Sequence, residues 1–305
     1  MREAILVMSY GTPERLEDVE AYYTHIRRGN PPPEHLLEEL IERYEAVGGP
    51  TELNRITRLQ ARALADELDR RGLDTRVYVG FKHVPPFIAD AVADMADDDV
   101  EAAVGLVLAP HYSLRSIAEY EHYAEQARPE SMEIDLIRSW HDHPAYVEWL
   151  ATRLENTLES VDGEPTVVFT AHSVPSRVLE KGDPYPDQLR ENCEQVAERA
   201  GVERWRFAYQ SAGRTDEPWL GPDVLDVVEE LADAGEDAIV VQAIGFVADH
   251  LEILYDLDIE VRDAARARGM SYARTPMPNV DPDFVSALAD LVEKRLASIA
   301  TSSAG

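Results

Sequence analysis

Two side chains that could bind a metal or carry a proton follow two strand-like segments of the sequence. Thr166–Ala171 is a continuous apolar run that leads into His172, and Ala238–Ile244 is a second run that leads through a short segment into Glu252. In open parallel α/β sheets, ligands bind in the crevice beyond the carboxyl ends of the strands. We therefore predict that the imidazole of His172 and the carboxylate of Glu252 face each other, as a divalent-metal site or a proton relay.

An acidic row continues from Glu252. Glu252, Asp256 and Glu260 are spaced i, i+4 and i+8, so their carboxylates line up along one face of a helix. In such an acidic chain, a solvated helix face is the ordinary explanation for this row. Its start beyond a buried strand, next to Asp249 and His250, favours a functional role instead. A file of hard oxygen ligands could pass a weakly held divalent cation along the helix.

The remaining histidines and motifs narrow the chemistry. His83 and His111 also follow expected strands, but a structural role is the favoured interpretation for both. His172 taken alone could equally be a hydrogen-bonded core residue. The sequence has no HExxH, Walker or G-x-G-x-x-G motif, so the zinc-protease, P-loop and dinucleotide-binding classes have no support.

Apolar runs of four to eight residues alternate with longer amphipathic stretches, which is typical of βαβ units and parallel sheets. The expected strands are Ala4–Met8, Thr75–Val79, Ala103–Leu108, Glu133–Ile137, Thr166–Thr170, Arg206–Tyr209 and Ala238–Ile244. The expected helices are Pro13–Ile26, Glu34–Tyr44, Leu53–Arg71, Pro85–Met95, Ser116–Gln126, Pro144–Glu159, Asp187–Ala200, Pro222–Leu231, His250–Arg268 and Asp281–Leu296.

A linker at residues 160–165 divides the chain near its middle. We therefore predict an α/β protein with two similar Rossmann-like lobes, residues 1–160 and 161–305, each with a parallel sheet flanked by helices. The first lobe has a long insertion at about residues 10–72, rich in aromatic residues and arginines, which we expect to form the lip of a binding cleft or an irregular packing layer. The second lobe carries the metal site, and the last helix is a candidate for packing back on the first lobe. A faint similarity between Leu108–His111 and Thr170–Ser173 hints at an internal repeat.

Composition excludes several classes of protein. The formal net charge of −30, with only three lysines, argues against nucleic acid as a partner, because that binding requires basic patches. An acidic surface adapted to high salt explains this charge better than a docking face for a basic partner. The single cysteine rules out a cysteine-ligated iron–sulfur cluster or a disulfide within one chain. No apolar run approaches a membrane span and no signal peptide precedes the first strand, so we expect a cytoplasmic protein.

Nine segments of the chain have a distinctive sequence: Val7–Pro13, Tyr22–Gly29, Arg43–Gly49, Gly80–Pro85, Ala109–His111, Ala171–Pro175, Gly182–Leu189, Pro218–Asp223 and Gly245–Asp256. In these segments the sequence closely resembles the ferrochelatases, which insert ferrous iron into a porphyrin during haem biosynthesis. The segments occur in the family's order across nearly the whole chain. The chain lacks the cysteine-rich tail and hydrophobic lip of the mitochondrial forms, and so it is most similar to the compact type associated with coproporphyrin III.

This resemblance implies two lobes around a porphyrin cleft and assigns the metal-site pair to His172 and Glu252, with Asp256 and Glu260 as accessory acidic residues. By position it implies six residues that contact the porphyrin: Tyr10, Arg27, Arg43, Tyr44, Thr51 and Tyr120. Among these, Tyr10 would lie below the porphyrin plane. Fe²⁺ and porphyrin would be substrates, with no permanently bound cofactor, in a monomer that makes transient contacts with neighbouring haem-pathway enzymes.

In the mechanism that we expect, a neutral His172 accepts a pyrrole proton, while Glu252 ligates iron or relays a proton. Two protein ligands suit a metal that must leave the site. Three alternatives remain open at this point: a protoporphyrin IX ferrochelatase, a tetrapyrrole or metal carrier without turnover, and a cobalt or nickel chelatase.

Overall fold

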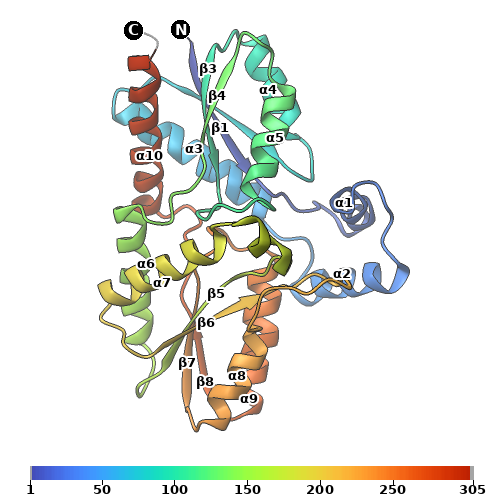
Figure 1. The fold of residues 1–305 in the computed structure, drawn as a ribbon, viewed down its shortest axis with the longest axis vertical. Helices are drawn as coiled ribbons and strands as arrows, with labels where there is room; N and C mark the ends of the chain where they lie inside the picture. The colour runs from blue at the N-terminus through green and yellow to red at the C-terminus, as the bar shows by residue number, and fades with distance from the viewer. Residues whose placement is uncertain (1, 303–305) are drawn as a thin grey trace. The chain divides into compact units, whose positions relative to one another are not determined.

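The computed structural model describes residues 2–302 and divides them into two compact units. The first unit comprises residues 2–110, 116–140 and 278–302, and the second comprises residues 111–115 and 141–277. Each unit contains one four-stranded parallel sheet covered by helices (Figure 1). This confirms the predicted fold class, whereas a porphyrin cleft remains a prediction. None of the helices in the described part of the chain is long and apolar enough to span a membrane.

The sheet of the first unit has the strand order β2-β1-β3-β4. Its strands are β1 (Glu3–Ser9), β2 (Arg76–Phe81), β3 (Ala102–Val107) and β4 (Glu133–Ile137). The helices of this unit are η1 (Leu16–Asp18), α1 (Val19–Ile26), α2 (Glu34–Ala46), α3 (Leu53–Arg70), α4 (Ile88–Asp97), α5 (Ile117–Ala127) and α10 (Pro282–Ser302). Figure 1 shows α3 and α10 on one side of this sheet and α4 and α5 on the other. A sheet covered on both faces needs apolar residues on both faces, and every residue of β3 is buried.

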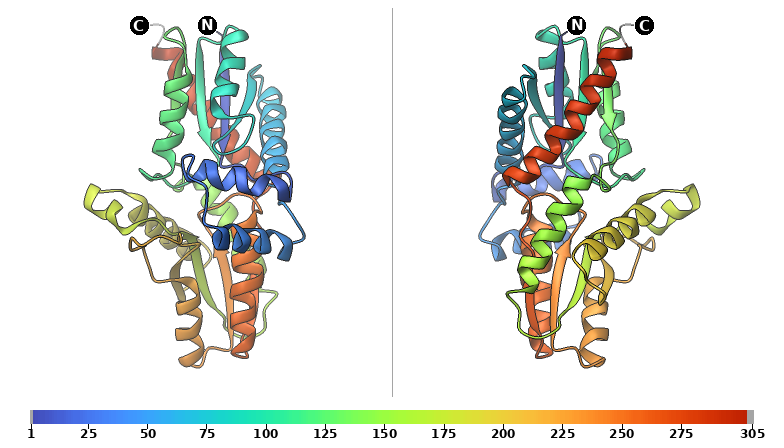
Figure 2. Two further views of the ribbon diagram at one scale, coloured as in Figure 1. Left: turned by 90° about the vertical axis from the view of Figure 1, so that its right-hand side faces the viewer. Right: turned by 90° about the vertical axis from the view of Figure 1, so that its left-hand side faces the viewer.

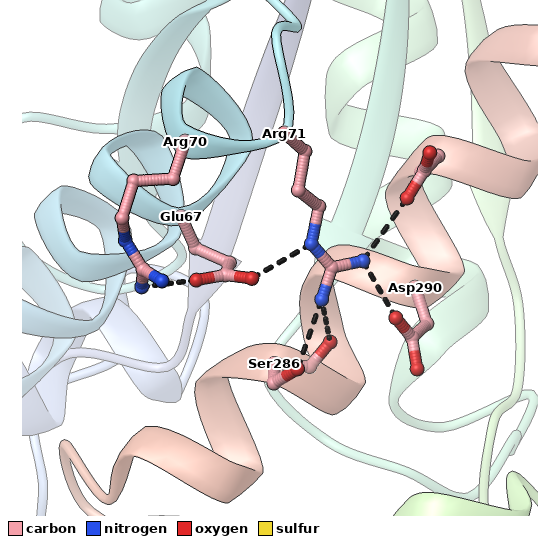
Figure 3. A network of polar contacts seen from close by, with 6 residues as sticks. Glu67, Arg70, Arg71, Ser286 and Asp290 are labelled. Atoms are coloured by element: carbon pink, nitrogen blue, oxygen red, sulfur yellow. Dashed lines mark hydrogen bonds and ion pairs between the residues drawn. The ribbon is translucent and has the colours of Figure 1, made fainter.

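The last helix belongs to the first unit, where α10 packs against α3 and β3 (Figure 2). Arg71, directly after α3, fixes this contact through polar bonds shown in Figure 3. Its guanidinium donates to the carboxylates of Asp290 and Glu293, at 2.6 and 3.0 Å, and to the hydroxyl of Ser286 at 2.9 Å. A bond of 2.7 Å to Glu67 holds the same guanidinium to α3. Arg71 therefore connects α3 to α10, two helices that are far apart in the sequence.

The sheet of the second unit has the strand order β6-β5-β7-β8, which repeats the order of the first. Its strands are β5 (Thr166–His172), β6 (Trp205–Gln210), β7 (Ala238–Ala243) and β8 (Ser271–Arg274). Its helices are α6 (Pro144–Leu158), η2 (Ser176–Lys181), α7 (Tyr185–Arg199), α8 (Val224–Asp233), the π-helix η3 (Glu252–Val261) and α9 (Arg262–Ala267).

Three features of the fold differ from the sequence-based expectations. The short strand β8 was not predicted, and the helix expected over His250–Arg268 is a π-helix followed by an α-helix. Apart from residues 111–115, the second unit begins at residue 141 and not near residue 160, because α6 packs against α7 and β7. Tyr146 of α6 donates to the main-chain oxygen of Ile244 at 3.2 Å, and Gln242 of β7 donates to that of Leu150 at 2.9 Å.

The repeated strand order also corrects the similarity between the halves. By strand order and hydrogen-bond register, β5 corresponds to β1, since the N–H of Leu108 donates to Met8 as that of Ile244 does to Thr170. The structural counterpart of His172 is therefore Tyr10, directly after β1. His111 follows β3, whose counterpart is β7. The similarity between Leu108–His111 and Thr170–Ser173 therefore does not join equivalent positions of the two sheets.

Candidate functional site

The strand order of the second unit places a ligand-binding position between β5 and β7. In this arrangement, the connections from these neighbouring strands run in opposite directions, so a crevice opens beyond their carboxyl ends. His172 is the last residue of β5, and Glu252 begins the π-helix that follows β7. The imidazole Nδ1 of His172 lies 2.8 Å from Oε2 of Glu252. The structure thus brings together the two residues that the sequence singled out.

The surroundings of His172 hold its backbone and one face of its ring. Tyr185, the first residue of α7, donates its hydroxyl to the main-chain oxygen of His172 at 3.0 Å. The next residue, Ser173, donates its hydroxyl to the main-chain oxygen of Leu220 at 2.8 Å. The ring of Trp219 stands edge-on to the imidazole, with centroids 6.3 Å apart. His172 is therefore fixed by two segments besides its own strand, the start of α7 and residues 219–220.

Each member of the His172–Glu252 pair stabilises the charged form of the other. Burial disfavours the imidazolium form of His172, but the Glu252 carboxylate outweighs burial and raises the pKa of His172 above its ordinary value. Burial also disfavours the ionised form of Glu252, and His172 outweighs it and lowers the pKa of that carboxyl. Side-chain exposures of 37% and 31% leave both groups within reach of a ligand. His172 is therefore a stronger base, and is neutral in a smaller fraction of molecules, than the sequence led us to expect.

The acidic row lies on the π-helix and not on an α-helix. A π-helix has i→i+5 hydrogen bonds, seen here where the N–H of Arg262 donates to the main-chain oxygen of Leu257. Asp256 is only 5% exposed and accepts a hydrogen bond from the hydroxyl of Ser211. Glu260 is half-buried. π-Helical segments are rare and occur frequently at functional sites, and this one carries all three acidic residues.

The donor set suits a metal in transit. Among residues 2–302, no group of three or more histidine, cysteine, aspartate or glutamate side chains is arranged to hold a metal ion. The His172–Glu252 pair offers one imidazole and one carboxylate, a combination that divalent first-row metals accept. Two protein ligands leave the remaining coordination positions open, as a site that hands its metal to another ligand requires.

In the first unit, two of the predicted porphyrin contacts gather around Lys82. Tyr10 follows β1 and is 39% exposed, with its ring centroid 4.4 Å from that of His83. The Lys82 ammonium lies 5.7 Å from the ring centre of Tyr10 and 5.1 Å from that of Tyr120, and it pairs with Glu119 at 2.7 Å. Tyr120 is only 4% exposed, so the structure gives its ring a packing position beside Lys82, and its contact with a porphyrin remains a prediction.

Two further predicted contacts meet at Thr12. The hydroxyls of Tyr44 and Thr51 lie 3.0 and 3.4 Å from the hydroxyl of Thr12. Tyr44 is 2% exposed, and Asn54 bonds both the N–H and the main-chain oxygen of Thr12 at 2.9 and 2.8 Å. This network fixes the loop after β1. The structure thus gives Tyr44 a packing role, and its contact with a porphyrin remains a prediction.

The two predicted arginine contacts belong to neither group. Arg43 is paired with Glu39 on the same helix, at 3.1 Å. The guanidinium carbon of Arg27 lies 5.9 Å from the ring centre of Tyr23. The Nε atom of Arg27 is buried and has no hydrogen-bond partner within the described part of the chain. A buried N–H without a partner is costly, so a ligand oxygen would be a favourable addition there.

Sequence reasoning missed three residues that contact the site: Tyr185, Gln210 and Ser211. Gln210 donates to the main-chain oxygen of Glu252 at 2.8 Å, and Ser211 donates to Asp256. The signal that could have found the last two is their place directly after an expected strand, the same position that singled out His172. Ser211 also has φ of 59°, an uncommon backbone conformation for serine that orients its hydroxyl toward the π-helix.

Comparison with known proteins places this geometry in a family. A model of the ferrochelatase family matches residues 2–296. The coproporphyrin III ferrochelatase of Anoxybacillus flavithermus is 44% identical, with 96% of both chains covered, and that of Bacillus subtilis is 43% identical, with 96% of this chain and 97% of the relative covered. The ferrochelatase of Thermus thermophilus is 45% identical, with 95% of this chain and 98% of the relative covered.

Solved structures agree in fold. SirB from Bacillus subtilis with Fe³⁺ has a TM-score of 0.58 at 13% identity, covering 96% of this chain and 95% of that chain. CbiX, the terminal enzyme of sirohaem biosynthesis in denitrifying bacteria, has a TM-score of 0.55 at 11% identity, covering 95% and 98%. Because the family model spans nearly all of the chain and the relatives exceed 40% identity over almost their full length, this protein belongs to the ferrochelatase family.

Proposed function

We propose that this ferrochelatase inserts Fe²⁺ into coproporphyrin III, giving iron coproporphyrin III in haem biosynthesis. The observation that carries the proposal is the hydrogen bond of 2.8 Å between His172 and Glu252, at the carboxyl end of the second sheet. The names of the relatives from Anoxybacillus flavithermus and Bacillus subtilis support the choice of porphyrin.

The pair can remove protons from the macrocycle. An ionised Glu252 carboxylate only accepts hydrogen bonds, so it holds the proton of His172 on Nδ1. The Nε2 lone pair is then free to accept a proton from a pyrrole nitrogen. The imidazolium that forms is stabilised by the same carboxylate, in accordance with the raised pKa of His172. Metal insertion releases two pyrrole protons, so the imidazole must pass the first one on before it accepts the second.

The acidic row can serve the metal. Glu252 offers a carboxylate oxygen to Fe²⁺, and buried Asp256 lies on the next turn of the π-helix. The iron is a substrate and leaves when the four macrocycle nitrogens replace its protein ligands. Ligands that are few and partly oxygen favour that release, because nitrogen donors compete well for a first-row metal.

The arginines can hold the rim of the porphyrin. Coproporphyrin III carries more propionate groups than protoporphyrin IX, so it benefits more from cationic partners. The partnerless Nε of Arg27 is one donor that a propionate oxygen could satisfy. In a chain of net charge −30, such local cations are needed to offset repulsion of an anionic substrate.

The experiment is anaerobic incubation of the protein with Fe²⁺ and each porphyrin in turn, followed by absorbance spectra over time. We expect the metallated spectrum to appear faster with coproporphyrin III than with protoporphyrin IX, and not to appear above background with the His172→Ala variant. A faster reaction with protoporphyrin IX would reassign the substrate. Tight porphyrin binding without metallation would make the protein a carrier.

The setting of the reaction is part of the same proposal. We propose a cytoplasmic enzyme that acts as a monomer and passes its product to the next haem-pathway enzyme through transient contact. Light scattering of the purified protein, with and without coproporphyrin III, tests the oligomeric state, and we expect the molar mass of one chain, 34.2 kDa, in both conditions.

A further inference from the structure

Gln210 contacts the segments that carry both members of the His172–Glu252 pair. It is the last residue of β6, and the register of the sheet pairs it with His172 on β5. Its main-chain oxygen accepts the N–H of Ser173 at 2.8 Å. Its side-chain Nε2 donates to the main-chain oxygen of Glu252, also at 2.8 Å.

These two contacts fix the backbone on both sides of the pair. His172 is held by the ladder between β5 and β6, since its own strand continues to that residue. Glu252 lies beyond the end of β7, after a segment, residues 244–250, that belongs to no strand or helix. The hydrogen bond from the Gln210 amide connects the first residue of the π-helix to the end of β6, beside His172 at the end of β5. Glu252 is thereby held relative to His172 by a rigid strand.

Burying the Gln210 side chain costs free energy, because its amide oxygen lies buried without a hydrogen bond. The residue is 0% exposed, and its Oε1 atom has no hydrogen-bond partner within residues 2–302. An apolar side chain of the same length would fill this volume without burying an unsatisfied amide oxygen. The bond from Nε2 to Glu252 is the compensating interaction, so the reason for an amide here is the position of Glu252.

We propose that Gln210 is a positioning residue for iron insertion, which holds Glu252 within hydrogen-bond distance of Nδ1 of His172. The inference rests on the proposed function and extends it to a residue that does not touch the substrate. Displacement of reacting groups by about 1 Å can cost up to 10²-fold in rate. Loss of the Gln210 amide should therefore act on the metal step and leave porphyrin binding unchanged.

The chain provides a matched control in Gln242. This residue is also on a strand of the second sheet, is 1% exposed, and donates from Nε2 to a main-chain oxygen, that of Leu150, at 2.9 Å. Its Oε1 atom likewise has no partner within the described residues. Its bond secures α6 and not the π-helix. Gln210→Leu and Gln242→Leu thus remove the same kind of bond from the same kind of site.

The experiment compares both variants with the wild-type full-length protein. The urea midpoints report stability, steady-state anaerobic kinetics give kcat and KM for Fe²⁺ and coproporphyrin III, and ¹⁵N imidazole spectra report the tautomer of His172. We expect similar losses of stability in the two variants. Gln210→Leu should lower kcat/KM for Fe²⁺ by between about tenfold and 10²-fold, with KM for coproporphyrin III unchanged, whereas Gln242→Leu should stay within about twofold of wild type.

The imidazole spectra separate this inference from the proposed function. In the wild type and in Gln242→Leu, the His172 proton should reside on Nδ1, and in Gln210→Leu the signal should move toward the free tautomer mixture. That shift would support positioning by Gln210 even if the wild-type protein inserted no iron. Unchanged His172 signals together with iron kinetics equal to those of Gln242→Leu would make Gln210 a packing residue and overturn the inference.

Discussion

The sharpest test of the site is a double-mutant cycle on His172 and Glu252. A general base typically contributes 10²–10⁴-fold to the rate, so His172→Ala should cost about 3–5 kcal/mol of transition-state stabilisation. In Glu252→Gln, the amide oxygen can still accept from Nδ1, but the charge that stabilises the imidazolium is lost. Hydrogen bonds to charged groups contribute about 1.5–3 kcal/mol, which corresponds to a loss of roughly 10-fold to 10²-fold.

The two losses should not add. The side chains are 2.8 Å apart, and in the proposed mechanism Glu252 acts largely through the imidazole. Residues in direct contact show interaction energies of about 0.5–3 kcal/mol. We therefore expect the double variant to be little slower than His172→Ala, with a coupling of at least about 1 kcal/mol.

The assay is the initial rate of coproporphyrin III metallation under anaerobic conditions, measured at several Fe²⁺ concentrations. Quenching of porphyrin fluorescence provides the control, because it measures the affinity of each variant for coproporphyrin III. This affinity should stay within about twofold of the wild-type value if both residues act at the ring centre. Two results would refute the reasoning. Retention of more than about a tenth of wild-type turnover by His172→Ala would remove the general base, and strictly additive losses would show that Glu252 acts independently of His172.

Other residues give predictions that are checked separately. Arg71→Met should lower the free energy of unfolding by about 1–2 kcal/mol in urea titrations, because the largely buried guanidinium loses its bonds to Glu67 and to the more exposed Asp290 and Glu293, while iron kinetics should change little. Arg43→Ala should weaken coproporphyrin III binding by about tenfold or more in fluorescence titrations, and unchanged affinity would remove Arg43 from the proposed rim. Asp256→Asn combined with Glu260→Gln should raise KM for Fe²⁺, and unaltered iron kinetics would remove both residues from the path of the metal. Burial, followed by the charges of neighbouring side chains, lowers the pKa of His83 to about 3, so its contribution to stability is complete above pH 6.5 and is lost as the pH falls toward 3. In His83→Phe, the free energy of unfolding should therefore decline less steeply over this range, by about 1.4 kcal/mol per pH unit, as measured by urea titrations at several pH values.

The strands with the clearest sequence signal are those buried on both faces. All residues of β7, and all of β5 except His172, are buried and most are apolar, as a parallel sheet covered by helices requires. β8 escaped prediction because it is a half-buried edge strand of four residues that pairs only with β7. Its sequence, Ser271–Arg274, has neither an apolar run nor a strict alternation. The domain boundary was misplaced because the linker at 160–165 is only the turn between α6 and β5.

The two principal residues of the site were predicted, and the residues that position them were not. His172 and Glu252 are found by a rule about strand ends, which needs no knowledge of which strands are neighbours. The role of Gln210 depends on the register between β5 and β6, and the sequence carries no signal for that register. The π-helix was also hidden, because a spacing of four residues keeps carboxylates on one side of either helix type.

The repeated strand order gives the two units equivalent positions with different side chains, and this difference is chemically informative. The positions of His172 and Gln210, at the ends of β5 and β6, correspond in register to Tyr10 and Lys82, which directly follow β1 and β2. In the first unit these positions hold an exposed aromatic ring and a buried cation 5.7 Å from its centre. An aromatic ring suits a flat macrocycle, whereas an imidazole and a carboxylate suit a metal and its displaced protons. On the proposed function, one architecture is thus used twice, first for the porphyrin and then for the iron. It follows that substitutions at Tyr10 should act on porphyrin affinity, and substitutions at Gln210 on the metal step.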